Sequence, residues 1–350
     1  MPKTVFFFHL FILLFFYSCT EKLSKKQFGL SATGKVGEIM VVCDQAIWES
    51  EIKKELDSQL TQFILPYFPD VATFEIKQRT TQEFKKGHKQ WRNLLILSID
   101  PKCDESEIIK EVDTYAESQL LIKIVAKNYN ELLDICKHNL NKVHQLFDDM
   151  EWKRLALRYK EETNNQILSS IKKNFGFALV LPNGSKIVSK RDNFFRIEFP
   201  LDSKPIEFDR GFGQSASFTQ SGLLIYQYPF SDSTQFELKN LLQARDTMLK
   251  YNVPHDVKGV YMGTQYHPLV YPEINTMWNM QSSLLGKEMR GMFQFLGKGD
   301  FKTGGAFWSF HFLNKNNKMV CVSGYVDAPP TVSWTYPLRK VQAVLKSISL

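Results

Sequence analysis

Hydrophobic patterns in the first part of the chain predict an α/β layer. The apolar stretch from Glu38 to Cys43 is typical of a buried strand, and helical spacing of apolar positions from Gln45 to Phe63 predicts a helix. Pro66 and Pro69 are expected to end that helix. Further strands are expected at Val71 to Lys77, Asn93 to Ile99 and Leu120 to Ala126. Strands separated by helices in this way favour an N-terminal α/β domain over residues 28–127.

A long helix is expected next, over residues 128–176, because neither proline nor glycine occurs between Pro101 and Gly176. Its apolar stripe consists of Leu133, Cys136, Leu140, Val143, Phe147 and Met150. The stripe spans fewer than three heptads, which favours a face packed on a core over a coiled coil. Asn174-Phe175-Gly176 supplies a natural end.

From Phe177 the pattern changes to short strands rich in aromatic residues. Strands are expected at Phe177 to Leu181, Asn193 to Phe199, Leu223 to Tyr228, Gly259 to Gln265, Met289 to Leu296, Phe307 to Leu313 and Met319 to Val326. Helices are expected from Gln235 to Tyr251 and from Pro337 to Ile348. An antiparallel sheet packed with these two helices would form a C-terminal domain over residues 177–350. The fold class is therefore α+β: an N-terminal α/β layer, a long connecting helix and a C-terminal antiparallel sheet.

The first residues carry a different pattern, which is typical of an export signal over residues 1–18. Lys3 is followed by an apolar run from Val5 to Phe16, interrupted by His9, and then by the small residue Ser18. This run is shorter than the roughly 20 residues that a membrane-spanning helix needs. Phe16-Tyr17-Ser18-Cys19 resembles a bacterial lipobox, so Cys19 is the expected lipid attachment residue. A plain cleaved signal, with Cys19 incidental, is the alternative.

The residues after Cys19 bear on location. Residues 19–27 are mostly polar and are expected to form a tether. Thr20-Glu21-Lys22 lacks an acidic cluster resembling a surface-export tag. We therefore expect a lipid-anchored protein on the periplasmic face of the outer membrane, with the cell surface as the alternative. Two interpretations of Lys22, Lys25 and Lys26 stay open: they lie against anionic lipid headgroups, or they belong to a solvated tether.

The amino-acid composition and the distribution of charge limit the classes of binding partner that can be expected. The 350 residues carry 44 basic and 37 acidic side chains, a net charge of +7. The two signs alternate, as in Glu51-Ile52-Lys53-Lys54-Glu55, rather than gathering in a basic stripe, so no nucleic-acid partner is expected. An envelope protein, a peptide or a glycan is the expected ligand, and the oligomeric state is open.

Four cysteines follow Cys19: Cys43, Cys103, Cys136 and Cys321. Buried free thiols are expected for Cys43, Cys136 and Cys321, because a chain of this length does not need disulfides for stability. An exported protein can nevertheless hold disulfides, and four cysteines allow three pairings between which the sequence does not choose.

The second half is similar to an uncharacterised lipoprotein family of Bacteroidetes that is known as a domain of unknown function. The resemblance rests on an ordered series of short motifs: Tyr226-x-Tyr228-Pro229, Arg245-Asp246, Gly259-Val260-Tyr261-Met262, Arg290-Gly291-Met292, Gly304-Gly305-Ala306-Phe307, Gly324-Tyr325-Val326 and Ala328-Pro329. Ser31 to Ile39 resembles the opening of the same family after its lipidated cysteine. The resemblance implies an exported lipoprotein. The family has no established activity, so no catalytic role can be carried over from it.

Motifs for catalysis or metal binding are weak. The histidines do not cluster, so no metal or other cofactor is expected. Gly213-Gln214-Ser215-Ala216-Ser217 lacks the closing glycine of a hydrolase nucleophile turn. Gly297 to Gly305 lacks the Gly-Lys-Ser/Thr ending of a phosphate loop and favours a hairpin connection. We expect non-enzymatic binding or scaffolding, with a hydrolase of envelope polymers as the alternative.

Four residues of the second half are the candidate binding residues: Arg245, Trp278, Arg290 and Trp308. Aromatic faces stack on sugars or peptides, and arginines bind acidic groups. The competing interpretation is that the tryptophans build the sheet core and that the arginines form structural ion pairs.

Overall fold

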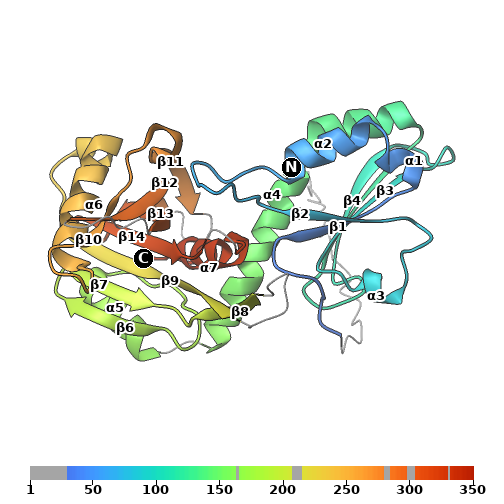
Figure 1. Ribbon diagram of the computed structural model, residues 1–350. Coiled ribbons are helices and arrows are strands. Elements are labelled where there is room, and N and C mark those ends of the chain that lie inside the picture. Colours follow the sequence, from blue (N-terminus) through green and yellow to red (C-terminus); the bar gives the residue numbers. More distant parts are fainter. Residues whose placement is uncertain (1–29, 163–164, 207–214, 280–283, 298–303, 330–331) are drawn as a thin grey trace, which may run out of the picture.

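The computed structural model describes residues 30–162, 165–206, 215–279, 284–297, 304–329 and 332–350. The expected signal segment, Cys19 and the tether lie outside these residues. Two sheets flank one long helix, which is α4 in Figure 1.

The N-terminal sheet has the strand order β2-β1-β3-β5-β4. Its strands are β1 (Glu38–Val42), β2 (Glu75–Arg79), β3 (Asn93–Ile99), β4 (Glu107–Val112) and β5 (Leu120–Ala126). All neighbours are parallel except β4, which pairs antiparallel with β5 at one edge. The helices before α4 are α1 (Gln45–Trp48), α2 (Glu51–Leu60) and α3 (Lys86–Lys89). Helices α2 and α4 pack against each other and enclose one hydrophobic core with the sheet.

Helix α4 (Tyr129–Glu162) is followed by α5 (Asn165–Phe175). The Asn128 side chain accepts a hydrogen bond from the Glu131 backbone N–H at 3.0 Å, which explains where α4 begins. Gly176, with a φ of +78°, adopts the left-handed conformation that ends α5. The expected core-facing stripe is confirmed, since Cys136, Leu140, Val143 and Phe147 are buried in the N-terminal core.

The C-terminal sheet follows the order β10-β12-β13-β14-β9-β7-β6, with β11 paired to β12 and β8 paired to β9. The strands are β6 (Lys186–Arg191), β7 (Phe194–Glu198), β8 (Asp202–Ile206), β9 (Ser215–Pro229), β10 (Tyr261–Thr264), β11 (Glu273–Asn279), β12 (Leu284–Leu296), β13 (Gly304–Leu313) and β14 (Lys318–Asp327). Their pairing is antiparallel throughout. Strands β12 and β13 pair antiparallel, as the expected hairpin requires, and most of the expected connection, residues 298–303, lies outside the described residues.

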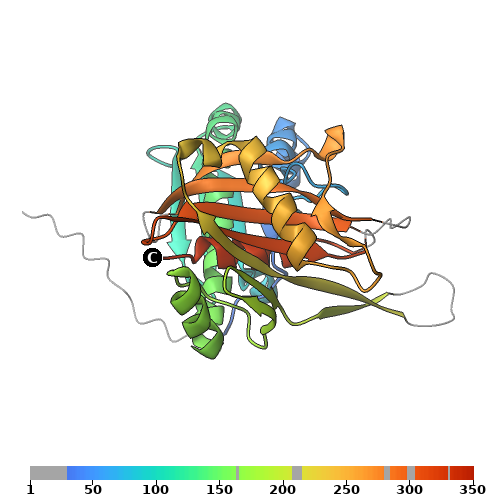
Figure 2. The same cartoon turned by 90° about the vertical axis from the view of Figure 1, so that its left-hand side faces the viewer.

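The two faces of this sheet are covered differently. Helix α6 (Leu238–Asn252), preceded by the 3-10 turn η1 (Ser233–Phe236), covers one face (Figure 2). Helix α7 (Thr335–Lys346) packs on the other face and against α4. A second 3-10 turn, η2 (Pro268–Val270), precedes β11. Trp152, Leu155 and Tyr159 of α4 enter the core under α7, so α4 contributes to a core on each side of the junction.

The expected α+β class is confirmed, while several expected elements differ in detail. The segment Phe177 to Leu181 is not a strand: its Ala178 forms an isolated bridge with Ser349, and its apolar side chains pack into the core instead. The strand expected at Val71 to Lys77 begins later, at Glu75. The helix expected from Gln45 to Phe63 is divided at Ser50, whose hydroxyl caps α2. Strands β4, β6, β8 and β11 were not predicted, because their residues are largely polar and lack a clear apolar alternation.

Among the described residues, no helix combines the length and the apolar character needed to cross a bilayer.

Candidate functional site

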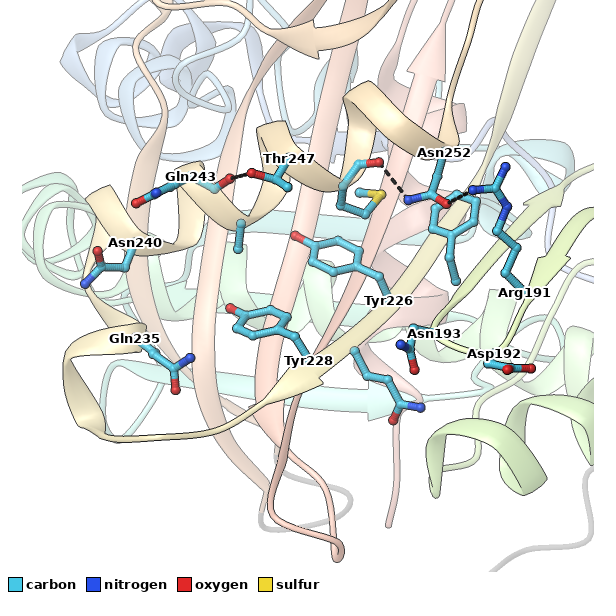
Figure 3. A pocket seen from close by; sticks show the side chains of 14 residues that line it. Arg191, Asp192, Asn193, Tyr226, Tyr228, Gln235, Asn240, Gln243, Thr247 and Asn252 are labelled. Carbon is cyan, nitrogen blue, oxygen red and sulfur yellow. Dashed lines mark hydrogen bonds between the residues drawn. The ribbon is translucent and has the colours of Figure 1, made fainter.

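A cavity of about 780 Å³ lies between α6 and the sheet strands β7 and β9 (Figure 3). Its floor is formed by Tyr226 and Tyr228 of β9, and its opposite wall by α6. The turn between β6 and β7 supplies Asp192 and Asn193, and η1 supplies Gln235. A concave site framed by a strand, a helix and two turns holds its side chains in fixed positions, as ligand pockets require.

The two tyrosines share one face of the sheet because alternate residues of a strand point to the same side. Their rings are nearly parallel, at 17°, with centroids 6.3 Å apart. Tyr226 is buried and Tyr228 is partly exposed at the cavity. Burial raises the pKa of both hydroxyls, so each remains a neutral O–H group at physiological pH.

The helical wall follows from a spacing of four residues. Asn240, Ala244, Met248 and Asn252 recur at i, i+4 along α6 and therefore lie in one row beside the cavity. The small Ala244 side chain leaves space opposite the tyrosines. Gln243 and Thr247 form a second row, and the Thr247 hydroxyl donates a hydrogen bond to the Gln243 backbone carbonyl at 2.8 Å.

Side-chain amides dominate the polar lining: Asn193, Gln227, Gln235, Asn240, Gln243 and Asn252 (Figure 3). The Gln227 amide donates to the Asn174 carbonyl at 3.0 Å. Within the described part of the chain, the side-chain amide groups of Asn193 and Gln243 make no hydrogen bond. Asn240 donates to the Thr234 carbonyl at 2.8 Å, which leaves its amide oxygen as an acceptor. Gln235 and Asn252 already donate to backbone carbonyls and accept hydrogen bonds within the protein. The amides of Asn193 and Gln243 and the amide oxygen of Asn240 remain to donate to or accept from a ligand with hydroxyl or amide groups.

Charged side chains are few in this cavity. Arg191 donates to the Asn252 amide oxygen at 2.8 Å and to the Tyr251 carbonyl at 3.3 Å, which joins the end of β6 to the end of α6. Of the described residues, Asp192 is the one carboxylate that lines the cavity. Glycosidase chemistry needs two carboxyl groups flanking the scissile bond, and this lining offers a single one.

A buried polar cluster lies on the same sheet face, beneath α6. Cys321 is the register partner of Tyr226, and its sulfur lies 3.7 Å from His311 Nε2. His311 Nε2 is also 3.0 Å from the Ser309 hydroxyl. Burial lowers the pKa of His311 to about 3, and the nearby Arg245 charge acts in the same direction. Burial raises the pKa of the Cys321 thiol to about 12, so it is not an activated nucleophile.

Arg245, a predicted binding residue, is completely buried beside this cluster and does not line the cavity. Its guanidinium donates to the Ser323 hydroxyl at 2.8 Å and lies 3.6 Å above the Phe307 ring centroid. Burial lowers its pKa. The guanidinium therefore stacks within the core under α6.

Arg290 and Trp308 are brought together on the opposite face of the sheet. They are register partners on β12 and β13, and the Arg290 guanidinium lies 4.2 Å from the Trp308 ring centroid. Arg290 also pairs with Glu288 at 2.5 Å. Trp278 occupies β11 opposite Leu285, and its side chain lies outside what the structure describes. Cys19, the expected lipid attachment residue, likewise lies outside the described residues.

The structure thus places Arg245, Arg290 and Trp308 outside the amide-lined cavity. The residues that line it carried two signals in the sequence: Tyr226 and Tyr228 alternate on one strand, and Asn240 and Asn252 lie three helical spacings of four apart. Their meeting depends on how α6 crosses the sheet. Among the described residues, no group of three or more His, Cys, Asp or Glu side chains could hold a metal ion, and all four described cysteines have free thiols.

Comparison with known families divides the chain into two stretches. Residues 32–160 match a family described as Domain of unknown function (DUF8532). Residues 164–347, more than half of the chain, match Domain of unknown function (DUF4837). The chain belongs to the DUF4837 family. The cavity between α6, β7 and β9 lies wholly within the DUF4837 stretch. A search of the curated proteins found no match.

Proposed function

We propose that the protein is a non-enzymatic binding protein of the cell envelope that holds a neutral glycan in the amide-lined cavity. In this proposal, acyl chains on Cys19 anchor it to the periplasmic face of the outer membrane, as in a Bacteroidetes lipoprotein. The observation that carries the binding proposal is the convergence of the amides of Asn193, Asn240 and Gln243 with two neutral tyrosines on one cavity.

A sugar ring presents hydroxyl groups that both donate and accept hydrogen bonds, together with C–H faces that are apolar. Amide side chains meet the first requirement, since each carries two donors and an acceptor with two lone pairs. Tyrosine rings meet the second, because they offer apolar area with a polar tip. The volume of about 780 Å³ lies in the range of small-molecule pockets and is large enough for a short oligosaccharide.

The charge of the cavity favours a neutral ligand over an acidic or basic one. Arg191 already donates to Asn252 and to a backbone carbonyl, and Asp192 is its chain neighbour of opposite sign. An ionic ligand would lose its hydration and find little compensating charge. A neutral polyol would exchange hydrogen bonds with water for hydrogen bonds with the amides.

Binding is tested by calorimetric titration with N,N′,N″-triacetylchitotriose and maltotriose as neutral glycans and with trialanine as a peptide. Tyr228→Ala and Gln243→Ala should each weaken glycan binding at least tenfold, since each removes a group that lines the cavity. Tyr251→Ala is the matched control, because Tyr251 is 66% exposed on the same helix and does not line the cavity. Saturable binding of trialanine but of neither glycan would overturn the glycan assignment, and equal affinities in all variants would overturn the site.

The anchor has a separate test. Native protein and the Cys19→Ala variant are compared by mass spectrometry and by fractionation of membranes. Wild type should carry acyl mass on Cys19 and sediment with outer membranes, whereas Cys19→Ala should be released. Membrane association of an unacylated Cys19→Ala protein would contradict the anchoring proposal.

A further inference from the structure

A second cavity, of about 930 Å³, lies at the junction of the two layers. Its walls come from the loop before β1, the loop before β2, the C-terminal part of α4, and the start of α7 with the residues before it. Three arginines line it: Arg92, at the start of β3, and Arg154 and Arg158 of α4. Because residues four apart on a helix lie one above the other, Arg154 and Arg158 face the same side of α4.

Two of these guanidiniums share one buried carboxylate. Glu151 is completely buried, and its Oε1 lies 2.9 Å from Arg92 Nε and 3.0 Å from Arg154 Nη1. The same oxygen accepts a hydrogen bond from the Asn93 amide at 2.6 Å. One negative charge therefore faces two positive ones, and buried cations without compensating anions are costly.

Arg154 is fully used as a structural residue. It donates to the carbonyls of Ser118 and Arg92 at 2.6 and 2.8 Å and to the Asn93 amide oxygen at 2.8 Å. Burial lowers its pKa to about 10 despite the Glu151 carboxylate, and the Arg92 charge acts in the same direction. The Asp113 carboxylate opposes this shift, as Glu151 does, so Arg154 is held by the protein's own groups.

Arg92 and Arg158 are the two arginines of this cavity whose guanidiniums keep N–H donors for a ligand. Arg92 uses its Nε toward Glu151, and no hydrogen bond within the described residues involves its two terminal nitrogens. Arg158 is exposed and forms side-chain hydrogen bonds with Tyr336 and Tyr159, and no carboxylate of the described chain pairs with it, so an incoming anion would be its first ionic partner. Its guanidinium lies 5.7 Å from the Tyr159 ring centroid, and Tyr336 of α7 lines the cavity beside it.

The acidic residues of this cavity do not neutralise that pair. Glu38 accepts a hydrogen bond from the Lys35 backbone N–H at 2.8 Å, and Glu75 pairs with Lys77. Asp70 is exposed in the loop before β2. All three belong to the loops and strand starts of the N-terminal layer, whereas Arg158 comes from α4.

From this arrangement we propose that the junction cavity binds an organic oxyanion, a carboxylate or a phosphate ester, through the guanidiniums of Arg92 and Arg158. Guanidinium forks bind both groups by paired, charge-assisted hydrogen bonds. The aromatic ring of Tyr336 gives the organic part of the ligand an apolar contact. This site is separate from the amide-lined cavity and does not depend on a glycan binding there.

The probes are 3-phenylpropionate for the carboxylate and phenyl phosphate for the phosphate ester, with inorganic phosphate as the bare ion. Each is titrated calorimetrically into the full chain at about 20 mM and about 200 mM salt. At least one organic probe should bind saturably and more weakly at high salt, because the contact is ionic. The stronger probe identifies the source of the oxyanion.

Arg158→Gln and Arg92→Gln should each weaken that binding at least tenfold. Lys142→Gln, which removes an exposed cation of α4 that lines neither cavity, is the matched control and should bind as wild type does. Arg92→Gln also removes a partner of buried Glu151, so its fold is checked by thermal unfolding, and Arg158→Gln decides the matter if that variant unfolds. Unchanged affinity in Arg158→Gln, or no saturable binding of either organic probe to wild type, would overturn the proposal.

Discussion

Acidification should destabilise the protein through His311, which is completely buried under α6. Burial lowers the pKa of His311 from its ordinary 6.5 to about 3 in the folded chain. Between these two values the unfolded chain binds a proton that the folded chain does not, so stability falls as pH falls. Above pH 6.5 the contribution is fully present, and it is lost as the pH falls toward 3.

The size of the effect follows from that shift. Each pH unit within the window changes the free energy of unfolding by about 1.4 kcal/mol. Between pH 7 and pH 5, allowing for partial protonation near the upper limit, His311 should therefore account for a loss of about 2 kcal/mol. His144 has a lowered pKa through burial and acts in the same direction, so a variant comparison is needed to isolate His311.

The assay is urea unfolding, followed by tryptophan fluorescence, of wild type and His311→Gln at pH 7, 6 and 5. Glutamine keeps a donor and an acceptor for the Ser309 hydroxyl but does not titrate. The difference in unfolding free energy between the two proteins should shrink by about 2 kcal/mol from pH 7 to pH 5. His138→Gln, at an exposed position of α4, is the control and should follow the wild-type curve. A constant difference across this pH range would refute the reasoning.

Three further predictions concern stability and are checked by urea unfolding at neutral pH. Glu151→Ala should cost about 3–5 kcal/mol, because it leaves two arginines without their shared carboxylate, and a cost below about 1 kcal/mol would contradict this. Tyr67→Phe should cost about 1 kcal/mol through loss of the buried 3.0 Å hydrogen bond to the Phe307 carbonyl, whereas an unchanged midpoint would mean that the contact is not formed. Gly305→Ala should cost at least about 1–3 kcal/mol, because its Cβ would lie 2.0 Å from the Val326 carbonyl oxygen, and wild-type stability would show that the strands can separate there.

The sequence predicted best those strands that are buried on both faces. Asn93 to Ile99 and Leu120 to Ala126 coincide with β3 and β5, which lie inside a parallel sheet and are therefore nearly continuous apolar runs. Strands β6 and β8 were missed because edge strands carry charged and polar residues. The start of β2 was predicted too early, at Val71 instead of Glu75. The Val71 side chain packs in the core of the C-terminal layer and not in the N-terminal sheet.

The candidate site was harder to predict because it depends on packing between distant segments. The alternation of Tyr226 and Tyr228 places both rings on one face, but the helix that faces them follows later in the chain. Arg245 was chosen for its charge, although its spacing from Leu241 and Leu249 assigns it to the buried face of α6. The position of Arg245 on the apolar face of the helix was therefore the sequence feature that indicated a buried residue.

Helix α4 links the folding of the two halves of the chain during synthesis. The boundary between the two family stretches falls at its end, yet Trp152, Leu155 and Tyr159 complete a core whose other members come mainly from beyond residue 164. When only the first stretch has been synthesised, the C-terminal part of α4 still exposes these apolar residues to solvent, because the segments that cover them have not yet been made. Early termination near residue 162 should therefore yield a fragment that exposes these apolar residues, aggregates and is degraded by quality-control proteases.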